Sequence, residues 1–140
     1  MKPLVVDTSV AIKWFLPEIH FEAASKVLTL KCELLAPDII WAEFGNALLK
    51  KARLDEISVQ EASDILKDFI RFPLQTYSSK PILNAAWHMA NETRSNVYDN
   101  LYLALAVNRD GALVTADRKF YDSMIKESYA SRIIWVEDIK

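Results

Sequence analysis

Short, unbroken apolar runs alternate with longer helical segments along almost the whole chain, and this alternation limits the possible folds more than any other feature. The expected strands cover 4–7, 34–36, 74–77, 112–115 and 133–136. One or two helical segments separate each strand from the next. Strands that are apolar throughout are buried on both faces, which is typical of a parallel sheet covered by helices. We therefore predict an α/β fold with a mostly parallel sheet.

Helix signals fill the gaps between these strands. Thr8 and Ser9 suit the start of a helix that ends at Leu16, because Pro17 cannot continue it. A capping-box pattern opens the segment 58–69. Further helices are expected at 20–31, 38–53, 81–92, 98–109 and 117–127. The chain has only two glycines, which excludes the glycine-rich loops that bind dinucleotides or nucleoside triphosphates.

Length and composition favour a single domain over 1–140. No linker, repeat or low-complexity tract divides the 140 residues, which are enough for one hydrophobic core. No apolar run reaches the roughly 18–20 residues of a membrane span, and the first residues lack the pattern of a cleavable leader. The single Cys32 cannot form an internal disulfide. We expect a cytoplasmic protein without a membrane partner. The net charge of −2 neither supports nor excludes nucleic-acid binding.

Four carboxylates close or interrupt apolar runs that otherwise resemble core. Asp7 and Asp117 follow two of the expected strands, whereas Glu43 and Asp99 lie on apolar helical segments. Each has an ordinary structural interpretation. The three aspartates occupy positions where an acid can cap a helix or interact with its dipole, and Glu43 can be a rim residue paired with Lys50.

Taken together, the four acids favour a metal site. A carboxylate near a core must be paired, protonated or bound to a metal, and the same runs contain no matching buried Lys or Arg. Parallel strands end at one edge of a sheet, so all four acids can converge there. Oxygen ligands without His or Cys favour Mg²⁺, with Mn²⁺ as an alternative. His20 and His88 lie outside this pattern.

The segments that carry these acids occur in an order typical of one protein family. They are LVVDTSVAIKWFLPE, LAPDIIWAEFGNALLK, NVYDNLYLALA and ALVTADRKF, spread over nearly the full length. In this combination the chain resembles the PIN domain and, more narrowly, the VapC-type ribonuclease toxins of bacterial and archaeal toxin–antitoxin pairs. The resemblance implies a three-layer α/β/α sandwich with a five-stranded sheet. It assigns metal binding and catalysis to Asp7, Glu43, Asp99 and Asp117, with Ser9, Asn46 and Thr115 as supporting polar residues.

The resemblance also implies a function. The implied function is that of a Mg²⁺-dependent endoribonuclease, which would hydrolyse RNA phosphodiester bonds and leave a 5′-phosphate and a 3′-hydroxyl. Asp7 and Asp99 would hold the central metal and Glu43 a bound water. Asp117 would either complete the first set of ligands or belong to a second metal. The implied partners are an RNA substrate, a cognate antitoxin protein and a second copy of the chain in a homodimer.

Two other functions remain as alternatives. The first is a catalytically silent PIN-like module that binds an antitoxin or RNA. The second is an aspartyl-phosphate phosphotransferase, which is disfavoured because such enzymes usually carry a second acid two residues after the first, where this chain has Ser9.

Basic and aromatic side chains supply candidates for RNA or partner contacts. The basic candidates, each of which also suits a solvated surface, are Lys13, Lys50, Lys51, Arg53, Arg94, Arg118 and Lys119. Core packing is expected for Trp14, Phe15, Trp41 and Trp87, with an interface as the alternative for Trp14 and Phe15.

Overall fold

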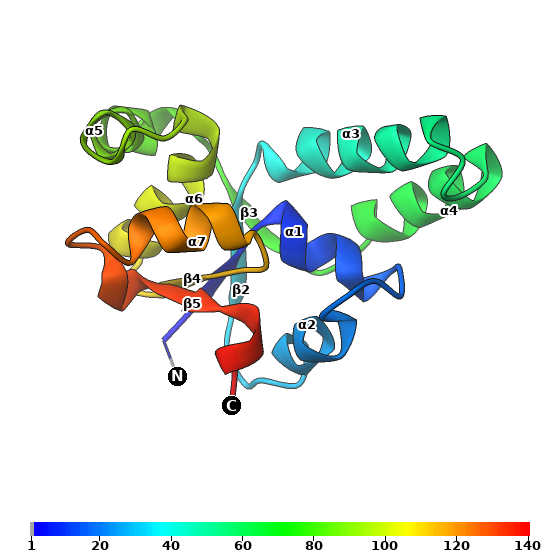
Figure 1. Cartoon of the computed structure of the whole chain (residues 1–140), viewed down its shortest axis with the longest axis horizontal. Helices are drawn as coiled ribbons and strands as arrows, with labels where there is room; N and C mark the ends of the chain where they lie inside the picture. Colours follow the sequence, from blue (N-terminus) through cyan, green and yellow to red (C-terminus); the bar gives the residue numbers. More distant parts are fainter. Residues whose placement is uncertain (1) are drawn as a thin grey trace.

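The computed structural model describes residues 2–140 and has a five-stranded parallel sheet at its centre (Figure 1). Met1, which belongs to the predicted domain 1–140, lies outside the described residues. The strand order is β3-β2-β1-β4-β5. Their bounds are β1 (Leu4–Val6), β2 (Leu34–Pro37), β3 (Gln75–Tyr77), β4 (Ala112–Thr115) and β5 (Ile133–Trp135). All four strand pairs are parallel, so the predicted α/β fold is confirmed.

Helices connect the strands as the alternation predicts. The α-helices are α1 (Thr8–Ala11), α2 (Phe21–Val27), α3 (Ile40–Arg53), α4 (Val59–Ile70), α5 (Leu83–Thr93), α6 (Val97–Asn108) and α7 (Arg118–Met124). Short 3₁₀ segments are η1 (Ile12–Trp14), η2 (Lys80–Ile82), η3 (Ala130–Arg132) and η4 (Val136–Asp138). None of the helices within residues 2–140 has the length and apolar character needed to cross a bilayer.

The chain crosses the sheet in two directions, and this reversal fixes where a site can form. From β1 it moves outward to β2 and β3, then returns to β4 beside β1 and continues to β5. Because parallel crossovers are right-handed, the helices of the two halves cover opposite faces of the sheet. The connections that leave β1 and β4 therefore diverge, and a crevice opens beyond the carboxyl ends of these two strands.

Burial explains why the central elements are apolar on every side. Val5 and Val6 of β1 and Leu113 of β4 have no exposed surface, and residues 100–106 of α6 are all buried. Helix α6 packs against β1, β2 and β4. Full burial of a large apolar side chain is worth about 1.5–3 kcal/mol, so these elements hold the crevice in a rigid frame.

The first helix is capped by Asp7, the ordinary structural role that the sequence allowed for this acid, whereas Thr8 and Ser9 were expected at the start of the helix. Asp7 is its N-cap, with Val10 N donating to the carboxylate, so Thr8 and Ser9 are helical residues and not caps. The α-helical part ends at Ala11 and continues only as the 3₁₀ segment η1. A carboxylate one position earlier competes successfully for the first free amides, because it is a strong acceptor beside the positive end of the helix.

Other boundaries shift by a few residues. The segment 20–31 is α-helical only over Phe21–Val27, and the segment 117–127 only over Arg118–Met124. The predicted capping box is confirmed, because Glu61 N donates to Ser58 Oγ over 3.0 Å and Ser58 N donates to Glu61 Oε1 over 3.1 Å. Such a cap is worth about 1 kcal/mol to its helix.

The aromatic side chains pack as expected, with one exception. Trp14 Nε1 donates to Ala24 O over 2.9 Å, and its ring stacks on Phe72 with centroids 4.9 Å apart. Phe15 lies edge-on to neighbouring phenylalanine rings. Trp87 was expected in the core but is 54% exposed, because it occupies the outer face of α5.

Candidate metal and catalytic site

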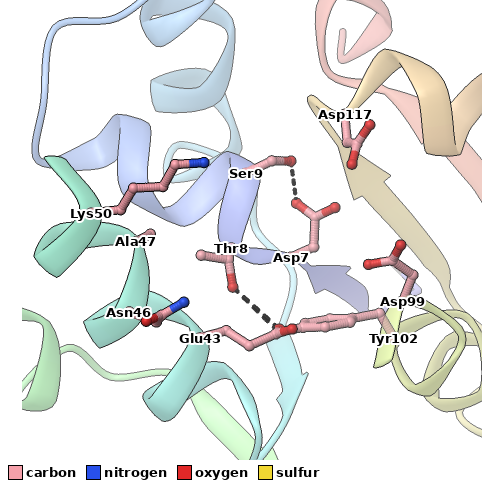
Figure 2. Close-up of a pocket in the computed structure, with 10 residues that line it drawn as sticks. All are labelled: Asp7, Thr8, Ser9, Glu43, Asn46, Ala47, Lys50, Asp99, Tyr102 and Asp117. Carbon is pink, nitrogen blue, oxygen red and sulfur yellow. Dashed lines mark hydrogen bonds between the residues drawn. The ribbon is translucent and has the colours of Figure 1, made fainter. Parts of the chain in front are cut away.

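A cleft of about 550 Å³ opens at the crevice beyond β1 and β4 (Figure 2). Four elements contribute its acids: the end of β1, helix α3, the first turn of α6 and the residue before α7. The lining residues are Asp7, Thr8, Ser9, Glu43, Asn46, Ala47, Lys50, Asp99, Tyr102 and Asp117. All four acids that the sequence analysis selected thus lie around one cleft.

Asp7 is held by three hydrogen bonds. Its Oδ1 accepts from Ser9 Oγ over 2.6 Å and from Val10 N over 3.2 Å, and its Oδ2 accepts from Thr115 Oγ1. Burial raises the pKa of Asp7 to about 6, although the bonds from Ser9 and Thr115 act in the opposite direction. Within residues 2–140 no Lys or Arg forms an ion pair with it. Its side chain is therefore fixed in place while its charge is uncompensated.

Ser9 and Thr115 also join the ends of β1 and β4. Ala116 N donates to Ser9 Oγ over 2.9 Å, and Asp117 N donates to Thr115 Oγ1 over 3.1 Å. The buried Thr115 hydroxyl thus touches both strand-end acids, one through its side chain and the other through its backbone. These contacts set the separation of Asp7 and Asp117 across the crevice.

Glu43 enters the cleft from α3 and is oriented by hydroxyl groups. Its Oε1 accepts from Tyr102 Oη and, over 3.5 Å, from Thr8 Oγ1. Burial raises the pKa of Glu43, and the nearby charge of Asp99 adds to this effect. Lys50 lines the same cleft, but no ion pair within residues 2–140 joins it to Glu43. The interpretation of Glu43 as a rim acid paired with Lys50 therefore has no support.

Asp99 lies in the first turn of α6, where a cap and a buried amide position it. Asp99 N donates to Asn96 Oδ1 over 2.7 Å, and Asn96 Nδ2 donates to Asp99 Oδ2 over 3.0 Å. The fully buried Asn100 donates through Nδ2 to Ser95 Oγ and to Asn96 O, both over 2.7 Å. Asn100 thereby holds the Ser95–Asn96 turn that orients Asp99. Burial raises the pKa of Asp99, and the charge of Asp117 adds to the rise.

Asp117 has the capping role that the sequence allowed and also faces the cleft. It is the N-cap of α7, and Phe120 N donates to its Oδ1 over 3.1 Å. The same carboxylate lines the cleft opposite Asp99 (Figure 2). The two interpretations of Asp117 are therefore compatible, because one oxygen suffices for the cap.

The charges of the cleft are strongly unbalanced. Its lining contains four carboxylates and one amine, Lys50. Asp99 is close enough to raise the pKa of both Asp7 and Glu43. Carboxylates that raise one another's pKa in a partly buried site accommodate a divalent cation readily, because it removes both the repulsion and the cost of burial. The donor set therefore fits a hard cation such as Mg²⁺.

The same residues are not gathered into a finished coordination shell. Across residues 2–140, no group of three or more His, Cys, Asp or Glu side chains is arranged to hold an ion as it stands. Each acid instead turns toward its own hydrogen-bond donors, as Asp7 does toward Ser9 and Glu43 toward Tyr102.

Three lining residues escaped the sequence analysis: Thr8, Ala47 and Tyr102. Tyr102 and Thr8 both donate to Glu43, but neither was selected as a site residue. A signal for Tyr102 was present, because it lies one helical turn after Asp99 and a buried phenol needs a partner for its hydroxyl. Asn46, which was selected, lines the cleft one turn after Glu43.

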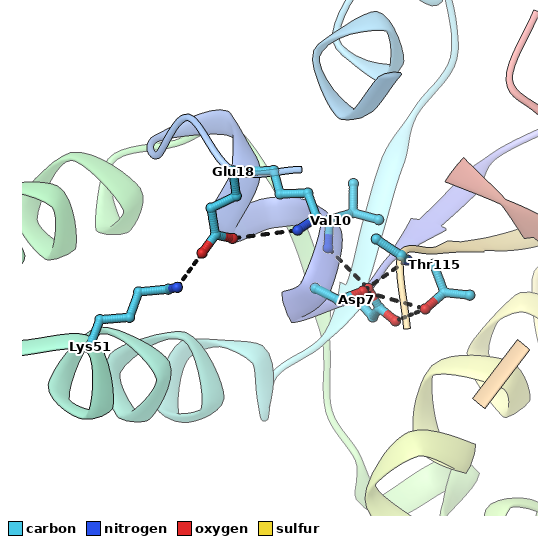
Figure 3. A network of polar contacts seen from close by, with 8 residues as sticks. Asp7, Val10, Glu18, Lys51 and Thr115 are labelled. Carbon is cyan, nitrogen blue, oxygen red and sulfur yellow. Dashed lines mark hydrogen bonds and ion pairs between the residues drawn. The ribbon is translucent and has the colours of Figure 1, made fainter. Parts of the chain in front are cut away.

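The basic candidates for RNA contacts separate into paired and unpaired groups. Lys13 and Lys51 both bind Glu18, away from the acids (Figure 3). Arg118 lies over the ring of Trp135, 3.9 Å from its centroid. Other basic side chains line the acidic cleft or the hollow next to it, and they are Lys50, Arg94 and Lys119.

Comparison with known proteins agrees with this geometry. Residues 4–123 match the family model described as the PIN domain. Ribonuclease VapC3 of Pyrobaculum aerophilum is 34% identical over 118 residues, which cover 83% of this chain and 90% of that protein. The crystal structure of PAE2754 from the same organism has a TM-score of 0.69 at 26% identity and covers 97% of this chain and 85% of that one.

A toxin–antitoxin complex from Klebsiella pneumoniae shares the fold at lower identity. Its matched chain has a TM-score of 0.63 at 14% identity, with 97% of this chain and 99% of that chain covered. The parallel sheet and the acids at the ends of its strands define an α/β protein of the PIN class. The chain belongs to the PIN-domain family, and its curated relatives are VapC ribonucleases.

Proposed function

We propose that the protein is a metal-dependent endoribonuclease that hydrolyses RNA phosphodiester bonds as the toxin of a type II toxin–antitoxin pair. One observation carries the proposal: four carboxylates from four separate elements line one cleft that contains a single amine. Helix capping alone does not explain why four acids share a cleft with one amine, because acids buried together normally have basic partners. The relatives named as VapC ribonucleases support the choice of RNA as substrate.

The proposed cofactor is Mg²⁺, with Mn²⁺ as a substitute. Asp7 and Asp99 are the central ligands in this proposal, Glu43 binds through a water molecule, and Asp117 is the remaining acid. A divalent cation in this position would activate a water molecule and stabilise the negative charge that develops on the phosphate and leaving oxygens. Oxygen ligands suit it because they leave positions free for water and phosphate.

The residues of the chain have separate tasks in this reaction. Ser9, Val10 and Thr115 fix the Asp7 carboxylate through their hydrogen bonds. Tyr102 and Thr8 fix Glu43 on the opposite wall, where it can orient a water molecule. Partners of this kind around ligand side chains typically contribute 10- to 100-fold to metal affinity or activity.

The proposal extends to the setting in which the protein acts. It is a single PIN domain over 1–140 in the cytoplasm, forms a homodimer and is inhibited by a cognate antitoxin protein. The structural neighbour described as a toxin–antitoxin complex supports an antitoxin as partner.

Digestion of total RNA tests the proposed activity. Purified protein with Mg²⁺ should cleave RNA at mapped sites, and EDTA should stop cleavage. The Asp99→Asn variant should be inactive, while Asp68→Asn, which changes an exposed acid on α4, should cleave like the unaltered protein. Cleavage that survives EDTA or Asp99→Asn would contradict the metal site. No cleavage by any form, together with tight binding of RNA or a partner protein, would favour the catalytically silent binding module.

A further inference from the structure

Three hollows that share lining residues follow one another from the acidic cleft to the outer face of α5, and we call this series the path. The acidic cleft shares Asp99 and Asp117 with a second hollow of about 460 Å³ that lies beside α7. The second hollow shares Arg94 and Ser95 with a third, of about 330 Å³, which is lined by Trp87. A chain molecule that passes over the acids can therefore continue past Arg94 to Trp87.

Cations lie on both sides of the acids along this path. Lys50 lines the acidic cleft, whereas Arg94 and Lys119 line the second hollow. All three residues are exposed, and no ion pair within residues 2–140 engages them. Exposed cations without acidic partners at the walls of a groove suit the phosphates of a nucleic-acid backbone.

Trp87 provides an aromatic face at the far end of the path. It is 54% exposed, whereas Trp135 is 6% exposed and Trp14 and Trp41 are partly buried. Its helix packs through other positions, including the buried Ala86 and Ala90, so the core does not require the indole. A groove that combines unpaired cations with an exposed aromatic ring is typical of proteins that bind single strands, because each base can stack on such a ring.

We propose that this path binds single-stranded RNA. The phosphate to be cleaved lies at the acids, a neighbouring phosphate contacts Arg94 and Lys119, and an unpaired base stacks on Trp87. The inference rests on the proposed ribonuclease function and assigns the residues that hold the RNA on one side of the acids, namely Arg94, Lys119 and Trp87. A base in a continuous duplex is disfavoured, because it would have to leave its own stack to cover the indole.

Binding measurements test the path separately from cleavage. A fluorescein-labelled single-stranded RNA 12-mer is titrated in Mg²⁺ with protein in the Asp99→Asn background, and anisotropy gives the dissociation constant. Adding Trp87→Ala should weaken binding about 5- to 100-fold, in keeping with the loss of one stacked base. Arg94→Ala or Lys119→Ala should each lower the slope of log affinity against log salt by about 0.7, as expected for one lost phosphate contact.

Controls make the result specific to the path. Lys67→Ala and Ile70→Ala change exposed residues on α4 and should leave binding within about twofold. RNA should quench the tryptophan fluorescence of the Asp99→Asn protein, and Trp87→Phe should abolish most of that quenching while retaining part of the affinity. A duplex of the same sequence should bind more weakly than the single strand.

Three outcomes would overturn the inference. Unchanged RNA affinity in Trp87→Ala, Arg94→Ala and Lys119→Ala would show that the path does not bind RNA. Equal affinity for the duplex would remove the single-strand preference. A Trp87→Ala variant that loses self-association in analytical ultracentrifugation but keeps its RNA affinity would assign this face to a second copy of the chain. Absence of RNA cleavage by the unaltered protein would instead contradict the proposed function, so the two failures are distinguishable.

Discussion

Glu18 and Asp7 are both partly buried carboxylates, but their surroundings have opposite electrostatic effects (Figure 3). Glu18 binds Lys51 and, over 3.4 Å, Lys13. Burial alone would raise the pKa of Glu18, but the bonds and charges of these lysines outweigh it and lower the pKa. Asp7 receives hydrogen bonds only from neutral donors, and burial raises its pKa to about 6.

The difference separates an acid that the chain neutralises, Glu18, from one that it leaves uncompensated, Asp7. At Glu18 the positive charge is supplied by the chain itself, through Lys13 and Lys51. At Asp7 the chain supplies geometry through Ser9 and Thr115, and no Lys or Arg within residues 2–140 forms an ion pair with it. An acid that is held firmly and left without a cationic partner is prepared for a cation from solution.

The largest expected effect is the difference in RNA cleavage rate between variants of Asp7 and Glu18. Asp7→Asn should lower the rate of RNA cleavage at least about 1000-fold, because charge stabilisation by a bound divalent cation is worth several kcal/mol. Glu18→Gln should leave the rate within about twofold. Initial rates on a fluorogenic RNA at saturating Mg²⁺ measure both. Similar losses in the two variants would show that the acids do not differ in function.

A smaller effect is expected from the hydroxyl that orients Glu43. Tyr102→Phe should lower the cleavage rate about 10- to 100-fold, because it removes the phenol that donates to Glu43. Tyr129→Phe is the matched control, since Tyr129 Oη donates over 3.1 Å to the exposed Glu92 and neither residue lines the cleft. An unaffected Tyr102→Phe enzyme would exclude a positioning role for this hydroxyl.

In EDTA, Asp7→Asn should raise the stability of the protein, although the same substitution lowers its activity. Folding raises the pKa of the Asp7 carboxyl from 3.8 to about 6. Protonation of this carboxyl therefore stabilises the native state at pH values below the unfolded-state pKa, and the stabilisation is lost as the pH rises through the folded-state pKa. At pH 7.5 the ionised Asp7 is therefore a burden, and Asp7→Asn should stabilise the protein by about 1–3 kcal/mol. The gain should disappear near pH 4. Urea unfolding at both pH values measures it, and a destabilised variant at pH 7.5 would contradict the uncompensated charge.

The smallest expected effect is the loss of stability on substitution of Glu18, the acid that is paired with lysines. Folding lowers the pKa of Glu18 from its ordinary value of 4.5. The ionised Glu18 therefore stabilises the native state at pH values above the unfolded-state pKa, and this stabilisation is lost as the pH falls through the folded-state pKa. Glu18→Gln should cost about 1 kcal/mol at pH 7, a modest amount because the pair is partly exposed. The same urea experiment checks it. If Glu18→Gln stabilised the protein as Asp7→Asn should, the contrast between the two acids would be wrong.

The sequence was sufficient to predict the architecture and to select four acids that line one cleft. The short, unbroken apolar runs predicted the parallel sheet, because strands such as β1 and β4 are apolar on both faces. The strand-end positions of Asp7 and Asp117 predicted that they would meet at one edge. Glu43 and Asp99 stood out because each interrupts an apolar helix.

Details that depend on three-dimensional neighbours were not predictable from the pattern. Tyr102 reaches Glu43 only because α6 and α3 converge at the cleft, although 59 positions separate the two residues. The exposure of Trp87 depends on which face of α5 packs against α6, and an apolar sequence neighbourhood does not give that direction.

Crystals soaked in Mn²⁺ test the central claim most directly, because anomalous scattering locates this cation among lighter atoms. The expected result is a peak in the acidic cleft, with carboxylate oxygens of Asp7 and Asp99 within about 2.0–2.3 Å and no peak in crystals of Asp99→Asn. A cleft without Mn²⁺ while the acids keep the positions seen in Figure 2 would contradict the account.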